Sequence, residues 1–183
     1  MTPHARSPRY APLIRLSGGR GDGPTALAAF DAALGSAGLA GFNLVRLSSV
    51  IPAGARVEVV SPPDQIPGEH GDLLYCVYAH GVAAEPGTEI WAGVAWALRD
   101  DGSGAGLFVE HHATTRAGVD AELSATIGAM MARRPESYVE AGRLLSHARC
   151  DGDPAAAVVV ASYRSVGWDE PMVAAGTAVP VLR

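Results

Sequence analysis

Lysine is absent from this sequence, because all 14 of its basic residues are arginines. Enzymes that use pyridoxal phosphate hold it as a Schiff base on a lysine side chain, so this route to amino-acid chemistry is excluded. A genome rich in G and C, which favours arginine and alanine codons, would explain the bias. The chemical exclusion holds whatever the cause.

Cysteine is scarce as well, since Cys76 and Cys150 are the two in the chain. They form neither a CxxC pair nor the larger thiol set of a structural zinc site or a disulfide framework. We therefore expect two buried, reduced thiols, and we expect no metal.

The charge and the hydropathy narrow the range of partners. The net charge is -5 and no arginine-rich run occurs, which argues against a nucleic-acid surface. No segment reaches the roughly 18 apolar residues of a membrane span, and no apolar stretch follows the basic residues near the N-terminus. We expect a cytoplasmic protein that binds neither nucleic acid nor membrane and acts on a small molecule.

The chain does contain enough apolar sequence for one core, because 48% of its 183 residues are hydrophobic. We expect residues 1–10 to form an N-terminal tail, 11–164 a single domain and 165–183 a C-terminal tail. The apolar periodicity predicts two helices, at 24–38 and 118–134.

The first expected helix carries an apolar stripe with helical spacing: Leu27, Phe30, Leu34 and Ala37. Asp31 lies along this stripe rather than opposite it, which is unusual for an acidic residue. A buried carboxylate needs a partner, and a bound cationic substrate could be that partner.

Strand-like segments make up most of the remaining sequence: 11–19, which enters a glycine-rich loop, then 42–51, 56–60, 73–82, 89–98, 106–113, 144–150 and 155–163. The segments at 73–82, 89–98 and 106–113 follow one another with short turns, which predicts an antiparallel meander. Trp91 and Trp96 are expected on opposite faces of their strand. The last segment is apolar on both faces and is expected at the centre of its sheet. Helices set among such strands indicate an α/β or α+β sandwich.

Two adjacent serines, Ser48 and Ser49, stand where the expected strand 42–51 meets a proline, in NLVRLSSVIP. One interpretation is a strand end whose hydroxyls bond nearby backbone groups. A hydrolase serine would need an elbow such as GxSxG, and no glycine flanks this pair. The other interpretation is self-cleavage. The Ser49 hydroxyl attacks the Ser48 carbonyl, the resulting ester undergoes β-elimination, and the dehydroalanine left at position 49 hydrolyses to a pyruvoyl group.

Three segments together make the second interpretation specific. NLVRLSSVIP, the preceding GDGPTALAAFDAALGSAGL and the later GLFVEHH resemble a pyruvoyl-dependent arginine decarboxylase, over about residues 13–164. The resemblance implies scission between Ser48 and Ser49 into chains 1–48 and 49–183. It also implies an αββα four-layer sandwich with mainly antiparallel sheets, assembled as a homotrimer or a dimer of trimers with active sites between neighbouring subunits.

The resemblance also implies roles for single residues. Ser49 would become the covalent pyruvoyl cofactor, which accepts the substrate amine as a Schiff base and takes up the electrons that CO₂ leaves behind. Glu110 would donate a proton to the resulting carbanion. Asn43 would act near the scissile bond as an amide donor. The implied substrate contacts are Asp31, which pairs with the guanidinium of arginine, together with Leu27 and Val50.

The sequence departs from the family pattern at two places. A second proline commonly follows the first in the family, whereas Ala53 follows Pro52 here. His111 and His112 stand beside Glu110, which raises a metal interpretation. On a strand, however, Glu110 and His112 share one face and His111 points to the other.

The favoured reaction is therefore arginine to agmatine and CO₂. Two alternatives remain open at this point. One is decarboxylation of another amino acid on the same scaffold, with Asp31 repurposed and His112 involved. The other is an unprocessed, non-catalytic homologue that acts as a structural subunit.

Overall fold

A computed structural model describes residues 12–61 and 66–169 of the chain. This described part forms two helices and nine strands, in the order β1 (Leu13–Asp22), α1 (Ala26–Ser36), β2 (Asn43–Arg46), β3 (Val50–Ile51), β4 (Arg56–Val59), β5 (Leu73–Ala83), β6 (Glu89–Arg99), β7 (Gly106–Ala113), α2 (Arg116–Ala132), β8 (Tyr138–Arg149) and β9 (Ala155–Val166).

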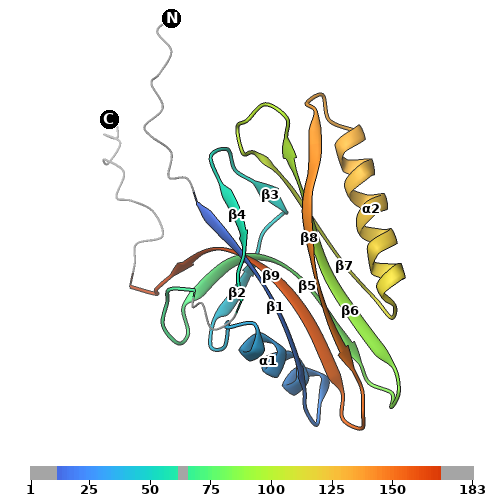
Figure 1. The fold of residues 1–183 in the computed structure, drawn as a ribbon. Coiled ribbons are helices and arrows are strands. Elements are labelled where there is room, and N and C mark those ends of the chain that lie inside the picture. Colours follow the sequence, from blue (N-terminus) through green and yellow to red (C-terminus); the bar gives the residue numbers. More distant parts are fainter. Residues whose placement is uncertain (1–11, 62–65, 170–183) are drawn as a thin grey trace, which may run out of the picture.

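The strands form two sheets that pack face to face, with a helix on each outer face (Figure 1). One sheet has the order β2-β5-β9-β1-β4 and the other the order β3-β7-β6-β8. Most neighbours are antiparallel, and the pairs β1–β4 and β2–β5 are parallel. The α+β sandwich with αββα layers is thus confirmed.

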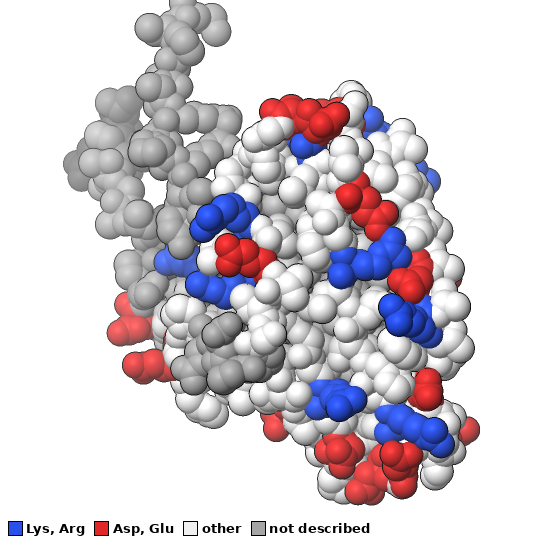
Figure 2. Space-filling view, in the orientation of Figure 1, with Lys and Arg blue, Asp and Glu red and all other residues white. Residues whose placement is uncertain are grey.

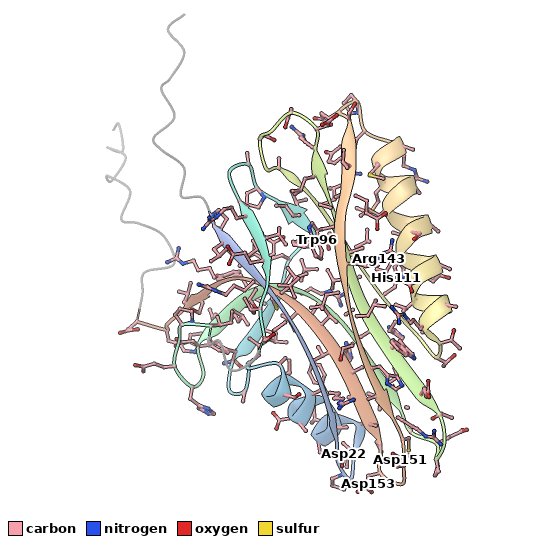
Figure 3. The ribbon with its side chains drawn as sticks, viewed as in Figure 1. Asp22, Trp96, His111, Arg143, Asp151 and Asp153 are labelled. Atoms are coloured by element: carbon pink, nitrogen blue, oxygen red, sulfur yellow. The ribbon has the colours of Figure 1, made fainter. Side chains whose placement is uncertain are left out.

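The main core lies between the two sheets. Trp96 of β6 packs there against Phe108 of β7, with ring centroids 6.5 Å apart, and Figure 3 shows Trp96 between the layers. Trp91 lies on the other face of β6, beside α2, where its ring stacks on His147 at 4.4 Å. The prediction that the two tryptophans face opposite ways is confirmed.

The helix α1 packs on its sheet through small side chains. Thr25 caps it by accepting a hydrogen bond from the amide of Ala28. Ala29, Ala33 and Leu34 are the buried residues of α1.

The predicted apolar stripe of α1 was wrong at its start. The side chain of Leu27 is 75% exposed, and Asp31 is exposed as well. The buried face of the helix therefore runs along the alanines, and Asp31 does not lie in the core. Because α1 lies so close to the sheet, only a narrow stripe of its side chains is buried.

Glycines in β1 permit this close approach. The strand continues to Asp22, through the stretch that was expected to be a loop. A Cβ on Gly19 would lie 2.6 Å from the Ala37 nitrogen, and one on Gly21 would lie 2.5 Å from the Cβ of Ala32. The glycine-rich sequence is therefore a smooth helix-packing surface and not a turn.

The predicted three-stranded meander was wrong, because its first strand belongs to the other sheet. β5 pairs with β2 and β9, whereas β6 pairs with β7 and β8. The short connection after β5 carries the chain from one sheet to the other. The antiparallel β6–β7 pair and the central place of β9 are confirmed.

The second predicted helix, at 118–134, is confirmed as α2, which buries Val119, Leu123 and Ile127. Both cysteines are free and buried, and burial raises the pKa of Cys76 to about 12.

The two expected tails fall mainly outside the described residues. The N-terminal tail, 1–10, lies wholly outside them, and of the C-terminal tail the first two residues belong to β9. No helix within 12–61 and 66–169 has the length and apolarity needed to cross a membrane. Acidic and basic side chains alternate around a largely uncharged centre on the face shown in Figure 2.

The close packing of α1 on β1 predicts that Gly19→Ala destabilises the fold. The added methyl group has no free space beneath the helix, so the free energy of unfolding should fall by roughly 1–3 kcal/mol. Urea denaturation followed by circular dichroism measures it. Gly35→Ala is the matched control, because a Cβ there meets no atom within 4 Å and alanine favours the helix. Equal stability of Gly19→Ala and wild type would contradict the packing argument.

Candidate active site

The serine pair lies where the chain crosses from one sheet to the other. The expected strand 42–51 is broken here, because β2 ends at Arg46 in the first sheet and β3 begins at Val50 in the second. On one side the Leu47 amide donates to the Cys76 carbonyl at 2.9 Å. On the other side the Phe108 amide donates to the Ser49 carbonyl at 2.8 Å. The peptide bond between the serines is thus held at both ends.

Ser49 has an unusual backbone conformation. Its φ of 65° is the one positive value at a non-glycine position in the described part of the chain. For a residue with a Cβ, this region costs roughly 1–3 kcal/mol and persists only where the surroundings enforce it. Ser48 is exposed and Ser49 is half-buried. The strain is therefore concentrated at one end of the predicted scissile bond.

Glu110 of β7 lies against the Ser49 side chain. The Ser49 hydroxyl donates to the carboxylate, with Oγ 3.0 Å from Oε1 and 2.9 Å from Oε2. The Glu110 side chain is only 18% exposed. Arg46 Nη2 lies 3.4 Å from the same Oε1. The structure thus joins Ser49 and Glu110, which sequence reasoning had selected from segments 61 residues apart.

The two histidines after Glu110 diverge as the strand alternation predicts. His111 Nε2 lies 2.8 Å from the Thr126 hydroxyl of α2, and Figure 3 shows His111 on the α2 side of the sheet. His112 is exposed. In the part of the chain that the structure describes, no three His, Cys, Asp or Glu side chains are placed to hold a metal ion.

A cavity of about 290 Å³ opens beside Glu110. Its lining residues are Arg46, Tyr78, Ala79, His80, Glu110, His111 and His112. His80 packs between two aromatic rings, 4.9 Å from Phe30 and 5.7 Å from Tyr78 by ring centroids. Burial lowers the pKa of His80, and the nearby His112 and Arg46 lower it further. The cavity is large enough for the amino and carboxylate end of an amino acid.

Tyr163 of β9 supports the segment that follows the serine pair. Its hydroxyl donates to the Val50 carbonyl at 2.9 Å. Burial raises the pKa of Tyr163, and the charge of Glu110 adds to the effect, so the phenol remains a neutral donor. Sequence reasoning missed Tyr163, since nothing in its local pattern connects it with a segment 113 residues away.

Asn43 does not contact the serine pair. It lies at the start of β2, and its side-chain Nδ2 donates to the Gly71 carbonyl at 2.6 Å. The same carbonyl accepts a hydrogen bond from the Trp168 indole at 2.8 Å. The expected amide donor is therefore engaged by the loop before β5.

The three expected substrate contacts lie on exposed surfaces of the chain. Leu27 and Asp31 are on the open face of α1, and Val50 is 56% exposed at the start of β3. None of them lines the cavity beside Glu110. The structure thus brings together Ser49 and Glu110, and it leaves the three expected substrate contacts facing outward.

Comparisons with known proteins identify the family of the chain. A family model described as pyruvoyl-dependent arginine decarboxylase matches residues 13–170. The chain belongs to this family. It is 43% identical to the pyruvoyl-dependent arginine decarboxylase of Halobacterium salinarum over 156 residues, 83% of this chain and 94% of the relative. It is 36% identical to the Methanothermobacter thermautotrophicus protein of that name, over 56% of this chain and 63% of the relative. The Thermococcus sibiricus protein of the same name is 41% identical, over 57% of this chain and 62% of the relative.

Membership of the pyruvoyl-dependent arginine decarboxylase family identifies the protein as a carboxy-lyase with a pyruvoyl cofactor. The crossing between the sheets fits such a group. A keto group formed at position 49 would keep its amide link to Val50, and the carbonyl oxygen that accepts from Phe108 belongs to that link. A carboxyl group already lies beside this position, as a proton donor must.

Proposed function

We propose that the chain cuts itself between Ser48 and Ser49 and then decarboxylates arginine to agmatine at the new N-terminus. One observation carries the proposal. The Ser49 hydroxyl, at a strained crossing between two sheets, is hydrogen-bonded to Glu110. If the serine pair were only the end of a strand, the Ser49 hydroxyl would instead bond to nearby backbone groups.

Scission follows from the position of the Ser49 hydroxyl. Its oxygen attacks the Ser48 carbonyl carbon, the peptide C–N bond breaks, and the hydroxyl proton ends on the freed nitrogen of residue 49. Loss of the α-proton of residue 49 then expels the Ser48 carboxylate, which keeps the former Ser49 oxygen. Hydrolysis of the remaining dehydroalanine consumes water and releases ammonia. Glu110 orients the hydroxyl for the first step, and release of the positive φ favours it.

The residues that would act in turnover lie beside position 49 or line the cavity next to Glu110. The pyruvoyl group supplies the electron sink for decarboxylation. Glu110 lies next to it and holds the proton that the substrate α-carbon receives once CO₂ has left. His80, kept toward its neutral form by burial, lines the cavity beside Glu110 without adding a permanent charge. We retain Asn43 as a donor to the Ser48 carbonyl, a role that requires its amide to leave Gly71.

The outward position of Leu27, Asp31 and Val50 supports assembly. The exposed carboxylate of Asp31 on α1 can bind a guanidinium through two parallel hydrogen bonds, but none of the three residues lines the cavity beside Glu110 in its own chain. A homotrimer, alone or paired as a dimer of trimers, would place α1 of one copy against the serine crossing of the next. The substrate would then be bound between subunits.

The first prediction concerns the hydroxyl that attacks. Ser49→Ala should remain one chain of full length, because alanine has no nucleophile. Intact-mass measurement after warm incubation detects the two fragments in the wild type. Ser48→Ala is the control and should still be cleaved, since the attacked carbonyl belongs to the backbone. Cleavage of Ser49→Ala would rule out the route.

Glu110→Gln should separate maturation from turnover. The amide oxygen of glutamine can still accept the Ser49 hydrogen bond, so scission should proceed. The amide cannot deliver a proton, and kcat should fall roughly 100-fold or more. Agmatine formation by the cleaved variant is the measurement. If the cleaved variant turned over at the wild-type rate, Glu110 would not be the proton donor.

Asp31→Asn should weaken binding of the guanidinium. Loss of a charge-assisted pair costs about 1.5–3 kcal/mol, so KM for arginine should rise roughly 10- to 100-fold, with kcat changed less. Asp22→Asn, at the end of β1, removes the same charge from another exposed site and should leave KM unchanged. An unchanged KM in Asp31→Asn would show that another group binds the guanidinium.

A further inference from the structure

Arg46 is the last residue of β2, two residues before Ser48. Tyr78 of β5 holds its guanidinium in two ways. Nη2 donates to the Tyr78 carbonyl at 3.1 Å, and the guanidinium carbon lies 4.8 Å from the centre of the tyrosine ring. The same Nη2 lies 3.4 Å from Glu110 Oε1. Although the side chain is 53% exposed, its head group is therefore oriented by a ring face, a carbonyl and a carboxylate.

We propose that Arg46 is a positioning residue that keeps the Glu110 carboxyl directed at position 49 once the chain has been cut. The inference rests on the proposed function. Among the described residues, Glu110 has two side-chain partners, Ser49 and Arg46. Scission removes the first, because the Ser49 oxygen departs in the new carboxylate of Ser48. Arg46 then remains to fix the carboxyl that must deliver the proton.

The charges around Glu110 favour the same role. Besides Arg46, the groups near it on neighbouring strands are Tyr78 and His80 of β5 and Tyr163 of β9. On β7 itself the next residues are His111, which bonds to Thr126 of α2, and the exposed His112. Burial keeps His80 and Tyr163 toward their neutral forms, since it lowers the pKa of the former and raises that of the latter. Arg46 is the member of this set that is cationic at every working pH. It can therefore balance the negative charge that scission creates at Ser48.

Loss of this cation would slow turnover. The carboxyl would be free to rotate away from position 49, and a displacement of about 1 Å at a reacting group can cost on the order of 100-fold in rate. A lower kcat with an unchanged KM would distinguish positioning of the carboxyl from a merely structural role.

The test measures kcat and KM of cleaved Arg46→Gln, with the wild type as reference. The expected result is a kcat lower by roughly 10- to 100-fold and a KM within about threefold of the wild-type value. Arg149→Gln is the matched control, because this arginine is 56% exposed and pairs with Asp151 in the connection between β8 and β9. It should behave as wild type.

Arg46→Lys keeps the test decisive if Arg46→Gln does not fold or is not cleaved. Lysine retains the positive charge without the planar guanidinium, so kcat should fall several-fold, less than in Arg46→Gln, and KM should stay close to the wild-type value. A wild-type kcat in cleaved Arg46→Gln or Arg46→Lys would overturn the inference. So would a variant in which KM alone rises, because Arg46 would then be a substrate ligand. An uncleaved or inactive wild type would instead refute the proposed function and the inference with it.

Discussion

The hydrogen bond between the Ser49 hydroxyl and Glu110 is the contact on which the account of this protein depends. It joins a residue on the crossing between two sheets to β7, a strand of the second sheet. The crossing is held on one side by Cys76 and on the other by Phe108, so Ser49 must adopt a positive φ between two fixed anchors. Removing the side chain of Ser49 would leave the fold intact and would remove the chemistry.

The four layers explain why one short segment can be strained without unfolding. The segment between β2 and β3 lies over a continuous core in which β9 is buried on both faces. Tyr163, at the end of that buried run, donates to the carbonyl of Val50 just beyond the crossing. Packing over many residues thus offsets a local cost of roughly 1–3 kcal/mol. After scission the same packing would hold both fragments in place.

The sequence predicted which residues meet at the site better than it predicted the strand topology. Ser49 and Glu110 were accessible through local motifs, whereas Arg46 and Tyr163 were missed because only the packing of β2 and β9 brings them to the site. The stripe through Leu27 failed because glycines in β1 let α1 bury alanines instead. The meander failed because alternation of apolar residues predicts a strand but does not say which of two sheets it joins. Asn43 and Asp31 remain predictions, since neither contacts the serine pair in this chain.

The most direct test of the central claim follows the Ser49 oxygen atom. Freshly made, uncut protein would be incubated in water enriched in ¹⁸O, and the fragment 1–48 would be weighed by mass spectrometry. Attack by the Ser49 hydroxyl predicts that this fragment gains no ¹⁸O, because its new carboxylate oxygen comes from the serine. A fragment that carries one ¹⁸O would show that water had cut the peptide bond, and it would contradict the account.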